Sequence, residues 1–72
     1  MTEALVLNID DQEAARYVRT RLLKQAGYRV REAGSGAQAL ELLETGSFDL
    51  VLLDVNLPDM SGLEVCRRIK AK

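Results

Sequence analysis

The sequence LVLLDVNLP at residues 50–58 decides how the rest of the chain is arranged. Its first four residues are apolar and are followed by the carboxylate of Asp54. An unbroken run of this kind, rich in Leu and Val, is typical of a strand buried on both faces of a parallel sheet under helices. Pro58 has no N–H to donate to a sheet, so the strand must end before it. Asp54 is therefore expected at the carboxyl end of a strand, where open α/β sheets bind their ligands.

Length and composition predict one small domain. A chain of 72 residues buries only about 60% of its unfolded surface, so it is marginally stable alone. The formal net charge of −1 and the lack of interleaved aromatic residues argue against a nucleic-acid partner. There is no signal-peptide pattern and no run near the roughly 20 apolar residues of a membrane span. Together with a single cysteine, this favours a cytoplasmic protein.

Two more strands precede the central one. Residues 4–9 form a nearly continuous apolar run, interrupted only by Asn8, which predicts a central first strand ending at Asp10 and Asp11. Residues 28–31 alternate apolar and basic side chains and are followed by Glu32 and Ala33, which is typical of a half-exposed strand at a sheet edge.

Three helices separate or follow these strands. Residues 12–26 are predicted to be helical, to bury one apolar stripe and to stop at Gly27. The stripe consists of Ala14, Ala15, Val18, Leu22 and Leu23, and the basic residues off it are Arg16, Arg19, Arg21 and Lys24. These basic residues are interpreted as a solvated face.

Two capping boxes mark the other helix starts. Ser35 and Gln38 precede a helix over residues 36–45, and Ser61 and Glu64 precede one that starts at Gly62. The last helix is still in progress at the end of the chain. Its expected apolar side is formed by Leu63, Cys66 and Ile69, with Cys66 as a buried small apolar residue.

The order of elements is βαβαβα. Such alternation predicts an α/β fold with parallel strands joined by right-handed crossovers, here part of a doubly wound sheet with strand order 2-1-3. That order places the ends of strands one and three side by side at the topological switch point. Asp10, Asp11 and Asp54 are therefore expected to share one small pocket.

Simpler roles exist for some of the acids. Asp10 or Asp11 could be the N-cap of the first helix, because Asp is a preferred capping residue. Asp49 and Asp59 are interpreted as a strand-start and a turn residue. Capping does not explain Asp54, because Ser61 is the better cap for the third helix.

Three clustered carboxylates favour a hard cation. Two like charges about 4 Å apart repel by roughly 4 kcal/mol at an effective dielectric constant of 20. Mg²⁺ removes this repulsion and prefers oxygen ligands, commonly one or two carboxylates together with phosphate and water. A carboxylate beside such an ion is also a plausible phosphoryl acceptor.

The motifs IDDQ at residues 9–12 and DVNLPDMSG at residues 54–62 resemble those of bacterial response-regulator receiver domains. The sequence GSGAQAL at residues 34–40 fits the same family, and the resemblance spans essentially the whole chain. It implies that Asp54 accepts phosphate from a phosphohistidine of a histidine kinase or phosphotransfer domain. It also implies that helix one serves as a docking surface, and it leaves Asn8 as a local variation with little bearing on the site.

The resemblance implies a magnesium site as well. Asp11 would bind Mg²⁺ directly and Asp10 largely through water. Asn56 would offer its backbone carbonyl to the metal, beside Asp54, with its side chain near the phosphoryl group.

The chain departs from the family in length. Receiver domains have five strands and five helices, whereas this chain stops in its third helix, without the Ser/Thr and Lys that contact the phosphoryl group. Residues 1–72 are therefore interpreted as a truncated receiver domain, cut from a longer response regulator or hybrid histidine kinase whose output domain is not in this chain. Met1 suggests that the receiver begins its protein. The bare edge of strand three predicts a homodimer or poor folding in isolation.

Three other functions are weighed. A Mg²⁺-dependent aspartyl-phosphate phosphatase uses Asp-x-Asp, but the second position here is Asn56. A pseudo-receiver that only binds a partner would usually lose one of the three acids. A flavodoxin-like nucleotide binder needs a phosphate-cradling loop after strand one, where Asp10 and Asp11 would repel phosphate.

Overall fold

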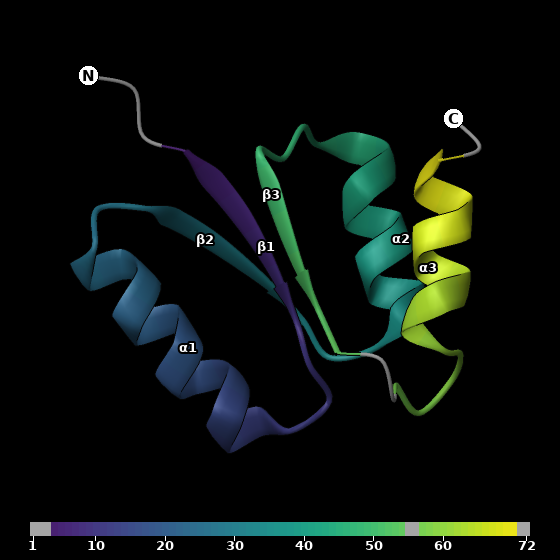
Figure 1. The fold of residues 1–72 in the computed structure, drawn as a ribbon, viewed down its shortest axis with the longest axis horizontal. Helices are drawn as coiled ribbons and strands as arrows, with labels where there is room; N and C mark the ends of the chain where they lie inside the picture. Colours follow the sequence, from purple (N-terminus) through teal and green to yellow (C-terminus); the bar gives the residue numbers. More distant parts are fainter. Residues whose placement is uncertain (1–3, 55–56, 71–72) are drawn as a thin grey trace.

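The computed structural model describes residues 4–54 and 57–70. Three strands and three helices alternate along them: β1 (Leu5–Ile9), α1 (Glu13–Gln25), β2 (Arg29–Ala33), α2 (Gly36–Thr45), β3 (Leu50–Leu53) and α3 (Gly62–Lys70). The strands are parallel and lie in the order β2-β1-β3, as predicted. Helix α1 lies on one side of the sheet, and α2 and α3 lie on the other (Figure 1). The α/β fold class is thus confirmed.

The sheet side under α2 and α3, called here the α2/α3 side, holds the apolar core. Leu7 and Ile9 of β1 are fully buried on it, because alternate residues of a strand face the same way. Apolar residues of the neighbouring strands and helices complete the core: Ala33, Ala39, Leu57 and Val65, with Val51 and Leu53 packed against them.

The opposite sheet side, called here the α1 side, is mixed in character. Val6 and Asn8 of β1 are both fully buried, and Glu32 pairs with Asn8 in the sheet register. Thr20 is the one described residue of α1 that is buried. This side therefore has polar groups that need hydrogen-bond partners.

The predicted apolar stripe of α1 is wrong in this structure. Val18 and Leu22 are 55% and 60% exposed, whereas Thr20 is buried and Arg16 reaches the sheet. The reason is that α1 contacts β1 and β2, which present Asn8 and Glu32 to it. Burying these polar groups without partners would cost more than exposing two apolar side chains.

Strand β3 is not buried on both faces, contrary to prediction. Leu50 is 49% exposed, and the next three residues are only half-buried. Among the described residues, β3 has a neighbour on one side only and forms an edge of the sheet.

Helix α3 turns inward only Ile69 of its three predicted apolar residues, and Val65 takes the place of the other two. Val65 is fully buried and Ile69 packs against the core, so the inward stripe has i,i+4 spacing. Leu63 is 68% exposed and Cys66 is exposed as well. The predictions for Leu63 and Cys66 were wrong because α3 packs mainly on α2, which the stripe of Val65 and Ile69 faces.

The predicted turn and cap residues act as expected. Gly27 has a φ of 99°, the left-handed conformation that ends α1. The hydroxyl oxygens of Ser35 and Ser61 each accept a hydrogen bond at 3.2 Å, from the N–H of Gln38 and of Glu64. Both helices therefore start where the sequence predicts.

Candidate phosphoacceptor and metal site

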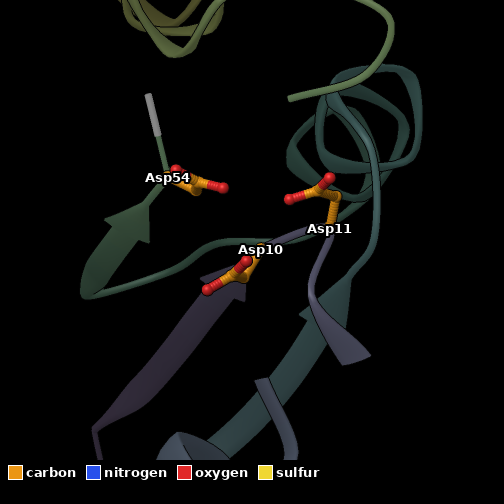
Figure 2. Close-up of side chains that lie close together, drawn as sticks. All are labelled: Asp10, Asp11 and Asp54. Atoms are coloured by element: carbon orange, nitrogen blue, oxygen red, sulfur yellow. The ribbon is translucent and has the colours of Figure 1, made fainter. Parts of the chain in front are cut away.

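Three carboxylates meet at the carboxyl ends of β1 and β3. Asp10, Asp11 and Asp54 each place a carboxylate oxygen within 4.8 Å of the others, and they are called here the acidic cluster. Figure 2 shows the side chains of Asp11 and Asp54 pointing toward one another, with Asp10 beside them.

The register of the sheet produces this meeting. Ile9 pairs with Leu53, and the N–H of Asp54 donates to the carbonyl of Ile9 at 3.0 Å. Both strands therefore end at the same level. Asp10 and Asp54 follow these strand ends directly and so lie at the same edge of the sheet.

Asp10 is the most constrained member of the acidic cluster. Its side chain is nearly buried, with 8% of its surface exposed. Its Oδ1 accepts the N–H of Gln12 at 2.9 Å, and its Oδ2 accepts Nη1–H of Arg19 at 3.4 Å. The N-cap of α1 is Gln12, without a side-chain capping bond, so the alternative that Asp10 or Asp11 caps this helix is wrong.

Asn8 connects β1 to α1 and thereby to the acidic cluster. Its Nδ2 donates to the carbonyl of Arg16 at 3.0 Å and to Oγ1 of Thr20 at 3.1 Å. Its Oδ1 accepts Nη1–H of Arg19 at 3.1 Å, the same nitrogen that reaches Asp10. The interpretation of Asn8 as a variation with little bearing on the site is therefore wrong.

Arg16 also links α1 to the sheet, through Glu32 and the backbone of Asp10. Its Nε donates to Glu32 at 2.9 Å and its Nη1 to the carbonyl of Asp10 at 2.8 Å. Its side chain is only 17% exposed, so the interpretation of the basic residues as a solvated face fails for Arg16 and for the bonded Arg19. The Thr20 hydroxyl and then the Arg16 guanidinium lower the pKa of Glu32, against the opposing effect of partial burial.

An open pocket of about 420 Å³ adjoins the acidic cluster. Asp10, Arg19 and Asp54 line it together with Leu52 and Leu53 of β3. A small anion or a hydrated ion could reach the carboxylates through this opening, with the Arg19 guanidinium in its wall.

The donor set fits a magnesium ion. Every ligand atom of the acidic cluster is a carboxylate oxygen, the type that Mg²⁺ prefers. Octahedral coordination at 2.0–2.1 Å places ligand oxygens about 2.9 or about 4.1 Å apart, so oxygens within 4.8 Å need only a small inward shift or a bridging water. The predicted fourth ligand, Asn56, lies outside the described residues.

Asp59 has a role that its sequence did not reveal. Its carboxylate accepts the N–H groups of Gly36 at 2.8 Å and Ala37 at 2.9 Å, at the start of α2. Both hydrogen bonds lower the pKa of Asp59, and the bond from Ala37 has the larger effect. They tie the segment that follows Pro58 to α2, 22 residues or more away, so no local pattern could have predicted them.

The close approach of this segment needs a glycine. A Cβ at Gly36 would overlap the side chain of Met60 and come within 3.2 Å of Asp59 Oδ1. Gly36 is therefore required for space rather than for backbone conformation.

Comparison with known proteins agrees with this architecture. Residues 6–72 match the family described as response regulator receiver domain. The chain belongs to this family, whose members are the receivers of two-component signalling.

Relatives and solved structures show the extent of the match. The chain is 36% identical over 70 residues to sporulation initiation phosphotransferase F of Bacillus subtilis, covering 97% of this chain and 56% of that protein. It is 38% identical over 68 residues to the CAI-1 autoinducer sensor kinase/phosphatase CqsS of Vibrio cholerae, covering 94% of this chain but 10% of that protein.

The response regulator TrrA of Thermotoga maritima, solved in complex with Mg²⁺-BeF, superposes with a TM-score of 0.91 at 35% identity. That match covers 94% of this chain and 59% of TrrA. The chain thus spans little more than half of even the shorter relatives. Among the residues that the structure describes, no helix is both long and apolar enough to cross a membrane.

Proposed function

We propose that this chain receives a phosphoryl group on Asp54 from a phosphohistidine of a histidine kinase or phosphotransfer protein. The observation that supports this most directly is the acidic cluster, formed at the ends of adjacent strands in a receiver-family chain. In the transfer, a carboxylate oxygen of Asp54 bonds to phosphorus while the phosphorus–nitrogen bond of the donor breaks. The imidazole nitrogen of the donor leaves with the bonding electron pair.

Magnesium is proposed as the cofactor, held by Asp10, Asp11, Asp54 and the backbone carbonyl of Asn56. When bound, the ion neutralises charge on the transferring phosphoryl group and its acceptor. Asp11 would bind it directly and Asp10 would bind it through water. The water-mediated role is supported by the two N–H donors that Asp10 already accepts, from Gln12 and Arg19. The complex of TrrA with Mg²⁺-BeF supports magnesium for this family.

We also make proposals about the domain organisation, the location and the assembly of the protein. We infer that residues 1–72 are the metal-binding and acceptor half of a receiver domain, acting in the cytoplasm with an output domain or kinase outside this chain. We also infer that two copies pair through the open edge of β3, whose Leu50 is 49% exposed. Size-exclusion chromatography that shows a stable monomer would contradict this pairing.

Two other functions remain as alternatives. A Mg²⁺-dependent aspartyl-phosphate phosphatase would need an acid where the chain has Asn56. A pseudo-receiver would bind partners without being phosphorylated. The first turns over phosphate and the second takes up none, so one labelling experiment separates both from a phosphoacceptor.

The test is intact-mass measurement after incubation with acetyl phosphate and Mg²⁺. We expect a labile gain of one phosphoryl group in the wild-type chain and none in Asp54→Asn. Asp49→Asn is the matched control, because Asp49 lies at the opposite end of β3 and binds the N–H of Leu5 at 2.7 Å. It should be labelled like the wild type. Equal labelling of Asp54→Asn, or no labelling of the wild type, would overturn the proposal for this chain.

A further inference from the structure

The positively charged guanidinium of Arg19 lies beside the acidic cluster, in the wall of the adjoining pocket. Arg19 reaches from α1 to Asp10, with 3.4 Å between Nη1 and Oδ2, and lines the same pocket as Asp54. Its side chain is 40% exposed and that of Asp10 8%, so the pair is only partly open to solvent.

The guanidinium is held in place by a buried acceptor. Asn8 is fully buried, and its side-chain amide is oriented by two donations, to the carbonyl of Arg16 and the hydroxyl of Thr20. With its amide nitrogen used in this way, its Oδ1 must face Arg19, whose Nη1 it accepts at 3.1 Å. Arg19 therefore meets Asp10 from a position set by β1 and α1.

We infer that Arg19, positioned by Asn8, is a resident cation of the acidic cluster that weakens its binding of Mg²⁺. The inference rests on the proposed metal site and adds to it a residue that sets the affinity. Arg19 acts through its charge and its contact with Asp10, and Asn8 is the residue that positions it.

The physical reason is charge competition. The guanidinium neutralises part of the negative charge that would attract a divalent ion, and it stands near enough to repel the ion itself. A dication about 6 Å from a unit positive charge is destabilised enough to lower its affinity about three- to tenfold in a solvent-exposed, partly screened site. Arg19 also holds one oxygen of Asp10, which would have to turn to serve the ion or its waters.

The test is the affinity of the 72-residue chain for Mn²⁺ alone, measured from the electron paramagnetic resonance signal of the free ion, with Mg²⁺ as competitor. We expect Arg19→Gln to bind about three- to tenfold more tightly than the wild type. Arg19→Lys keeps the charge and should bind within about twofold of the wild type. Arg21→Gln removes the same charge from a residue that contacts Tyr17 instead, and it should leave the affinity nearly unchanged.

The role of Asn8 is tested by changing it both in the wild-type chain and in the Arg19→Gln variant. Asn8→Leu should move the affinity toward that of Arg19→Gln, because the guanidinium loses its anchor. In the Arg19→Gln background the same change should have no effect on metal affinity. Circular dichroism confirms that each variant is folded before its affinity is compared.

The outcomes separate this inference from the proposed function. A wild-type chain that binds no Mn²⁺ overturns the metal site, and the inference with it. A wild-type chain that binds, with Arg19→Gln binding equally or more weakly, overturns the role of Arg19 and leaves the metal site standing. An effect of Asn8→Leu that is the same in both backgrounds contradicts the coupling of Asn8 to Arg19.

Discussion

The two sides of the sheet are held to their helices by different forces. On the α2/α3 side, Leu7, Ile9 and Val65 are fully buried among other apolar residues. On the α1 side, Asn8 is equally buried but is surrounded by hydrogen bonds to Thr20 and Arg16 and from Arg19. Apolar packing does not depend on direction, whereas each of these hydrogen bonds fixes a donor and an acceptor.

The difference matters because the α1 side contacts Asp10 of the acidic cluster through two arginine side chains. Arg16 donates to the carbonyl of Asp10 and Arg19 to its carboxylate, so both contacts come from α1. No buried side-chain nitrogen or oxygen in the described part of the chain lacks a partner. The α2/α3 side thus supplies most of the apolar stabilisation, and the α1 side determines the electrostatics of the candidate site.

The largest effect should come from truncating the α2/α3 core. Leu7→Ala removes a fully buried side chain and should cost about 2–5 kcal/mol of unfolding free energy, enough to leave a small domain largely unfolded. Leu22→Ala makes the same change on α1, where the side chain is 60% exposed, and should cost less than about 1 kcal/mol. Urea unfolding followed by circular dichroism compares them. Similar losses in the two variants would mean that the outer stripe of α1 is covered in solution.

The next effect concerns the polar contacts of the α1 side. Asn8→Leu keeps nearly the same volume but leaves the Thr20 hydroxyl and the Arg16 carbonyl without their donor. We expect a loss of about 1–3 kcal/mol in the same urea experiment, from groups left unsatisfied in a buried site. If Asn8→Leu were as stable as the wild type, the buried polar contacts would add nothing to stability.

A smaller effect of opposite sign is expected in the acidic cluster. Asp11→Ala should raise the stability of the metal-free chain by about 1 kcal/mol, because it removes one of three close negative charges. Thermal unfolding without Mg²⁺ should show a higher midpoint, and added Mg²⁺ should stabilise the wild type more than the variant. A lower midpoint without metal would show that the repulsion is already relieved within the chain.

The smallest effect is a dependence on acid pH through Asp59. Hydrogen bonds from Ala37 and Gly36 lower its pKa from the ordinary value of 3.8, so its anionic form favours the folded state. Its contribution is fully present above that pH and is lost as the pH falls through the lower pKa of the folded state. Asp59→Asn should therefore be less stable than the wild type at neutral pH, with the difference shrinking in acid. Unfolding at a series of pH values measures this, and a constant difference would contradict it.

Much of the fold and part of the candidate site could be predicted from sequence. Strand order and the meeting of Asp10, Asp11 and Asp54 depend on features that are local in the sequence: apolar runs, capping residues and acids placed at strand ends. The geometric rules for parallel sheets then bring those ends together without further information.

By itself, then, the sequence determined the order of the elements, the helix caps and the place of the acidic cluster. Only the tertiary structure decided which side of α1 is buried, that Arg19 bonds both Asn8 and Asp10, and that Asp59 binds the start of α2. The physical reason is that a helix with both apolar and polar residues can pack against a sheet with more than one of its sides. The choice depends on what the neighbouring sheet presents, and contacts between residues far apart in the chain have no local signature.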